Sequence, residues 1–181
     1  MINIVIEAID RIYRKYDHDF FRSSCKENFE LPLELKNYIE SQGLALIDMF
    51  DNECPSRTWY ISFKDYIKGE FKVSYKTMLQ VSKITPLFYV QHEFSVENKD
   101  ENSMTSELDG FDEQPYNKGQ AELHDRICAS LGEKRYIQLA YSEANEVISD
   151  LNMPEDVTVF GPQVTVESLL FRDVFDICNK E

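Results

Sequence analysis

The order of apolar and polar residues predicts helices at the start of the chain and strands in its middle. Over residues 2–16, apolar side chains recur at spacings of three and four, which predicts an amphipathic helix. The same spacing over about 32–42 predicts a second helix, with Pro32 in its first turn and Gly43 as its stop. From residue 57 the period changes to two, so strands are expected from there.

These strands are expected to pair as an antiparallel meander. Alternation over about 59–63 and 71–75, with a turn signal at Lys68 and Gly69, predicts a β-hairpin. A third strand is expected over about 86–96. Its first half is apolar on both sides and its second half on one side only. Short links between consecutive strands favour antiparallel pairing.

Helical and strand patterns continue to the end of the chain. They predict a helix over 117–131, short strands at 136–139 and 157–160, a short helix capped by Ser142 and a last helix capped by Thr165. The sequence therefore predicts one α+β domain over residues 1–181. Its mainly antiparallel sheet would be packed by helices from the N- and C-terminal ends.

A stretch at about 97–116 breaks every period and predicts a long acidic loop. Loops of this length inside compact domains are usually functional or disordered. Its acidic residues are Glu97, Asp100, Glu101, Glu107, Asp109, Asp112 and Glu113. Leu108, Phe111 and Tyr116 lie among them. Aromatic anchors ringed by charge are typical of interface hot spots, although the same side chains could pin the loop to the core.

The net charge of −14 is concentrated in the second part of the chain. Residues 1–83 hold 12 basic and 13 acidic side chains, whereas residues 84–181 hold 7 and 20. Such acidity argues against nucleic acid and anionic membranes as partners. The acidic stretch could serve solubility, or it could attract a basic protein partner. A calcium site is the third interpretation, but the spacing fails that of an EF-hand.

Composition favours a packed protein without a targeting segment. Apolar residues make up 43% of the 181 residues, which is enough for a full core. Glu7 and Asp10 interrupt the apolar N-terminus, so we expect no secretory signal, no membrane span and a cytoplasmic location. The four cysteines form no CxxC motif. Free thiols are therefore favoured over two disulfides.

Candidate chemistry rests on the three histidines. His18 is expected at the C-terminal end of the first helix, flanked by two acids. His92 falls on the apolar side of the third strand and is expected to be a hydrogen-bonded core residue. His124 and Cys128 share a helix face, a geometry that suits two metal ligands or a Cys–His pair. The sequence contains no phosphate-binding loop, no nucleophile elbow and no zinc-protease motif, so we expect no cofactor.

Three stretches carry a resemblance to a known class of proteins: VSKITPLFYVQHEFSVEN at 81–98, LDGFDEQPY at 108–116 and FGPQVTVESLLFRDVFDIC at 160–178. They resemble small bacterial proteins that are encoded beside polymorphic or contact-dependent toxins. Such neighbours are immunity proteins. The resemblance implies a single-domain cytosolic protein that binds one toxin domain tightly and blocks it.

The leading hypothesis is therefore a non-catalytic immunity-type protein that neutralises a cognate, basic toxin domain. The seven acids of the loop together with Phe111 and Tyr116 would form its binding surface. A second hypothesis is a small hydrolase or metal-assisted enzyme that uses His92 or His124. A third is an acidic regulatory adaptor that uses the same surface on another basic partner.

Overall fold

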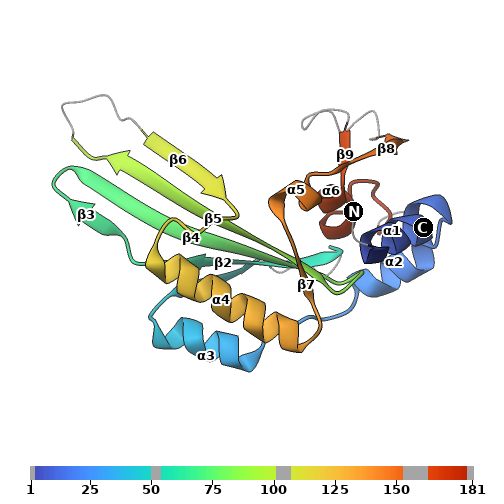
Figure 1. The fold of residues 1–181 in the computed structure, drawn as a ribbon, viewed down its shortest axis with the longest axis horizontal. Coiled ribbons are helices and arrows are strands. Elements are labelled where there is room, and N and C mark those ends of the chain that lie inside the picture. The colour runs from blue at the N-terminus through green and yellow to red at the C-terminus, as the bar shows by residue number, and fades with distance from the viewer. Residues whose placement is uncertain (1–2, 50–53, 101–106, 153–162, 179–181) are drawn as a thin grey trace.

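A long sheet forms the centre of the computed structural model, which describes residues 3–49, 54–100, 107–152 and 163–178. Figure 1 shows its strands running side by side, with helices below it and at one end. The strands are β1 (Ala45–Met49), β2 (Ser56–Ser62), β3 (Tyr66–Lys68), β4 (Phe71–Ser82), β5 (Leu87–Asn98), β6 (Glu107–Asp112) and β7 (Ile137–Leu139).

The strand order is β1-β2-β4-β5-β6, with β3 added to β4 and β7 added to β5. Every pair is antiparallel except β5 with β7. A separate antiparallel pair is formed by β8 (Val147–Asn152) and β9 (Gln163–Thr165). The predicted α+β class and the mainly antiparallel meander are thereby confirmed.

The helices form two groups on opposite faces of the sheet. One group is α3 (Leu33–Ser41) and α4 (Lys118–Glu133), which lie under the sheet in Figure 1. The other gathers both ends of the chain: α1 (Asn3–Ile9), the π-helical segment η1 (Asp10–Arg14), α2 (His18–Cys25), α5 (Tyr141–Ala144) and α6 (Val166–Phe171). None of the helices in the described part of the chain has the length and apolar character that a bilayer-spanning segment needs.

Each helix group encloses its own apolar core. Under α3 and α4, the buried residues include Trp59, Ile61, Leu79, Val90 and Ile127. On the other face, the terminal helices bury Ile9, Phe21, Leu87, Leu169 and Phe171. Because β5 begins between the two cores, its first four residues are buried on both sides. This agrees with the apolar character that the sequence gives to both sides of that segment.

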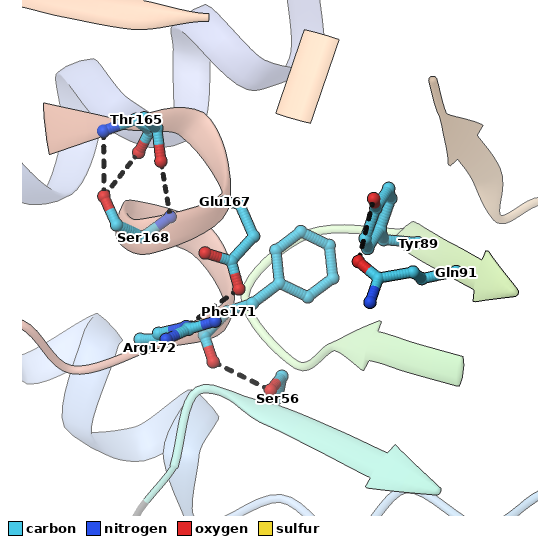
Figure 2. Close-up of polar contacts among 8 residues, drawn as sticks. All are labelled: Ser56, Tyr89, Gln91, Thr165, Glu167, Ser168, Phe171 and Arg172. Atoms are coloured by element: carbon cyan, nitrogen blue, oxygen red, sulfur yellow. Dashed lines mark hydrogen bonds and ion pairs between the residues drawn. The ribbon is translucent and has the colours of Figure 1, made fainter. Parts of the chain in front are cut away.

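Hydroxyl groups of the sheet fix the C-terminal end of α6. The last carbonyls of a helix have no partner within the helix. Here Ser56 Oγ donates to the Phe171 carbonyl at 2.8 Å, and Ser82 Oγ donates to the Leu170 carbonyl at 2.9 Å. At the other end, Thr165 Oγ1 accepts from the Ser168 amide, as predicted for the cap (Figure 2). The short α6 is thus held at both ends.

The prediction of a loop over 97–116 is wrong for most of the residues that the structure describes there. Residues 97 and 98 continue β5, and 107–112 form β6, which pairs with β5. The sequence pattern did not predict β6, because this strand has few apolar residues and its acids interrupt the alternation. Residues 101–106, and the strand predicted at 157–160, lie outside the described residues.

Local predictions near the chain ends need three further corrections. The helix predicted over 2–16 widens into η1 and ends at Arg14, and Tyr16, with a positive φ of 58°, is exposed. His18 begins α2 instead of ending a helix, because Asp17 caps α2 by accepting from the Phe20 amide. The short helix is α5, with Ala140 instead of Ser142 at its N-cap. The four cysteines are thiols that form no disulfide, as expected.

Gly110 allows β6 to lie close against β5. A Cβ atom at this position would stand 2.5 Å from Phe94 Cε1. The Phe94 ring cannot turn away freely, because it packs edge-on against Tyr116 with ring centroids 4.6 Å apart. The absence of a side chain at Gly110 therefore lets an aromatic pair sit beneath the edge strand.

Gly110→Ala should lower the free energy of unfolding by about 1–3 kcal/mol, because the added methyl group overpacks against Phe94. Urea denaturation at neutral pH measures the change. Gly132→Ala is the matched control: it lies in α4 with open space around it, so it should stabilise by up to about 1 kcal/mol. Equal effects of the two substitutions would contradict this account of Gly110.

Candidate functional site

The sheet face opposite α3 and α4 is hollowed beside β6, where the terminal helices no longer cover it. This hollow, called here the β6 groove, has a volume of about 790 Å³. Its lining comes from the segment 62–76, from β5 and from β6, and it includes Asp65, Lys76, Gln91, Glu93, Glu107, Asp109 and Phe111.

Strand β6 turns three of the predicted residues toward this groove. In its register with β5, Glu107 is opposite Glu97, Asp109 is opposite Ser95, and Phe111 is opposite Glu93. Residues that are directly opposite share one face of the sheet. Glu107 and Asp109 are exposed, and Phe111 keeps 57% of its surface exposed. The facing pair of Glu107 and Glu97 places like charges together, which is destabilising.

The groove has an excess of acid. Lys76 Nζ lies 3.0 Å from a Glu93 carboxylate oxygen, so these two charges compensate each other. Asp65 accepts from Ser74 Oγ at 2.8 Å and lies 3.2 Å from Lys72 Nζ. The Ser74 hydrogen bond, with Lys72 beside it, lowers the pKa of Asp65 and keeps it ionised.

Within the described residues, neither Glu107 nor Asp109 has a basic partner. Glu97, in contrast, lies 3.9 Å from Lys72 Nζ. The acidic excess of the groove is therefore concentrated on the edge strand.

Other residues of the acidic stretch, including the predicted binding residues Asp112 and Tyr116, lie on the opposite side of β6. Asp112 is opposite His92, and Leu108 is opposite Val96, so both belong to the face that α4 covers. Tyr116 packs on Phe94 of that same face. A partner that touched both Phe111 and Tyr116 would have to wrap around the edge of the sheet.

Three more predicted acids are placed outside the groove lining or outside the described residues. The Glu113 carboxylate accepts a hydrogen bond from the Tyr141 amide, which fastens the start of α5. Asp100 follows the end of β5, and its amide donates to Asn98 Oδ1 at 3.0 Å. Glu101 lies outside the described residues.

Sequence reasoning missed two acids of the groove, Asp65 and Glu93. Glu93 alternates regularly on the polar side of β5, which looks like an ordinary solvated strand. Only the pairing of β4 with β5 places it opposite Lys76. Asp65 stands between β2 and β3, and no pattern in the sequence connects it with 107–111.

The two candidate histidines form a pair between β5 and α4, in which His92 is buried and His124 is half-buried. His92 is completely buried, and its Nε2 lies 3.0 Å from Nδ1 of His124 on α4. Its Nδ1 lies 3.0 Å from Thr77 Oγ1. Burial first, and the neighbouring His124 second, lower the pKa of His92 to about 4. His92 is therefore a neutral, hydrogen-bonded core residue at neutral pH, as expected from its position on the strand.

His124 also borders a second cavity, of about 490 Å³, together with Glu113, Asp125 and Glu143. Burial lowers the pKa of His124 and raises that of Cys128, whose thiol donates to Gln138 Oε1 at 3.1 Å. A thiol that stays protonated is a poor nucleophile and a poor metal ligand. Among the described residues, no group of three or more His, Cys, Asp or Glu side chains is arranged to hold a metal ion.

Comparison of the chain with family models, with curated proteins and with solved structures found no match.

The buried histidine should make stability depend on pH. The unfolded chain binds a proton at His92 near the ordinary value of 6.5, whereas the folded chain does so only near 4. The contribution of His92 to the free energy of unfolding is thus fully present above about pH 6.5. It is lost as the pH drops toward 4, which lowers the free energy of unfolding by about 3 kcal/mol in all. Urea denaturation between pH 7 and 5, above the range in which most carboxylates titrate, measures the slope.

His92→Gln should flatten this slope, because the glutamine amide does not titrate. His18→Gln, at a half-buried position near the surface, is the matched control and should keep the slope of the unmodified chain. The assignment fails if the His92 variant retains the same pH dependence.

Proposed function

We propose that this protein is a non-catalytic, cytoplasmic immunity-type protein that binds and neutralises a basic toxin domain through the β6 groove. The observation that supports this is the edge strand itself. β6 holds Glu107 and Asp109 without described basic partners, next to the exposed aromatic ring of Phe111. Charge attracts a cationic partner over distance, and a large aromatic side chain anchors it at contact.

The position of β6 in the sheet favours binding of a protein surface. Among the described strands it pairs with β5 alone, so its outer edge faces away from the sheet. Edge strands are usually protected by lysine, proline or a bulge. β6 has neither lysine nor proline, and its register with β5 is regular. Its acids keep it from pairing with other acidic strands and leave it open to a basic partner.

The hydrolase or metal-assisted enzyme is supported by one observation, the cavity that His124 shares with three carboxylates. Two features weaken it. His92 is enclosed, and the nearest thiol, Cys128, is held protonated. An adaptor protein would use the same acidic groove on another basic partner, and the identity of that partner distinguishes it from an immunity protein.

The proposal predicts that a neighbouring reading frame encodes a toxin with a basic C-terminal domain, and that this domain forms a nanomolar or tighter complex whose association slows with added salt.

Replacing Glu107 and Asp109 together by Lys should slow association at least about tenfold, because the steering field of the groove is reversed. Phe111→Ala should instead speed dissociation. Surface plasmon resonance with an inactive variant of the toxin domain measures both rates.

Replacement of Glu40 and Glu133 by Lys is the matched control. These exposed acids lie on α3 and α4, and the double change alters the net charge by the same amount. The control should change association by less than about threefold. Equal slowing in both double variants would exclude the groove as the binding site. A toxin domain that does not bind the unmodified chain would overturn the function itself.

A further inference from the structure

The edge of the sheet opposite β6 is a different kind of surface. β1 pairs with β2 from Ala45 with Ser62 to Met49 with Thr58, without a bulge, and among the described strands it pairs with β2 alone. All five of its residues are exposed, with Ile47 at 53% and Met49 at 54%. An exposed, regular, apolar edge strand is a template for pairing with another strand.

β1 is also electrically neutral. Its single charge, Asp48, accepts two hydrogen bonds from the Arg57 guanidinium, at 2.9 Å and 2.6 Å. Arg57 lies on β2 of the same chain and is itself mostly buried. β1 therefore offers no free acid to a basic protein, in contrast to β6. It also belongs to residues 1–83, where 12 bases nearly balance 13 acids.

We infer that β1 pairs with β1 of a second copy of this chain, in an antiparallel, two-fold arrangement. In such a pair centred on Ile47, each Ala45 faces the other Met49 and Ile47 faces Ile47, so three apolar positions of each copy meet on one face. The two neutral edges approach without bringing the acidic parts of the chains together.

The other possible pairings of edges are disfavoured by charge or by symmetry. Two antiparallel β6 strands paired along their full length would place Glu107 of each copy opposite Asp112 of the other, and like charges in direct opposition repel. Pairing of β1 with β6 would be heterologous, so it would give a ring or an open filament instead of a closed dimer. The two-fold β1 pair closes and leaves both β6 grooves at the outer ends of the joined sheet.

Sedimentation velocity of the full chain over a concentration series tests this inference, and it needs no toxin domain. The unmodified chain should reach twice the 21.3 kDa mass of one copy. Ile47→Lys should raise the dissociation constant at least about tenfold, because it buries an unpaired charge in the pair. Ile67→Lys on β3, where the isoleucine is 62% exposed against 53% for Ile47, should leave the dimer intact.

A cysteine at the two-fold axis reports the register. Under mild oxidation, Ile47→Cys should give a cross-linked dimer, whereas Ile67→Cys and the unmodified chain should not. A chain that stays monomeric at every concentration, or an Ile47→Lys variant that dimerises as tightly as the unmodified chain, would overturn the inference. Species larger than a dimer would point to the heterologous pairing instead. None of these results depends on toxin binding, so the two proposals can fail separately.

Discussion

The antiparallel pairing of β4 with β5 is the constraint on which the rest of the structure depends. It extends from Phe71 with Asn98 to Val81 with Phe88. Because side chains alternate along a strand, this register decides which residues of both strands meet α3 and α4 and which face the other way. A shift of β4 by one residue would turn Leu79 away from α3 and α4 and turn Lys76 toward them. The two helix groups and the groove all take their positions from this pair.

The groove arises because the terminal helices cover only part of their face of the sheet. Apolar residues such as Leu87 and Tyr89 at the start of β5 hold α1 and α6 there. Further along the same face, Gln91, Glu93 and Ser95 offer no apolar surface on which a helix could pack. The open half is therefore polar by composition, and β6 extends it with acids and one exposed aromatic ring. The histidine pair lies behind this face, where Gln120 Nε2 also ties α4 to the Lys76 and Glu93 carbonyls.

The two edges of the sheet, β6 and β1, differ in charge. β6 combines an exposed backbone edge with two acids, Glu107 and Asp109, that have no basic partner among the described residues, so this edge carries negative charge. The only acid of β1 is neutralised within the chain by Arg57, so the exposed surface of this edge is neutral and largely apolar. Most of the net negative charge of the chain lies after residue 83. The fold places part of this charge on β6 at one edge of the sheet, whereas β1 at the other edge is neutral.

The sequence by itself determined the elements whose residues form a regular pattern: the α+β class, the long strands, the buried start of β5, α4, and the Thr165 cap. It also located the acidic segment, though not its strand. Register and tertiary contact decided the rest. They turned Glu107 and Asp109 toward Asp65 and Glu93, sent Asp112 and Tyr116 to the other face, and joined His92 to His124. Local pattern determines which side chains lie on the same side of one element. Which elements meet depends on the burial of apolar faces from distant parts of the chain, and no short window of sequence contains that information.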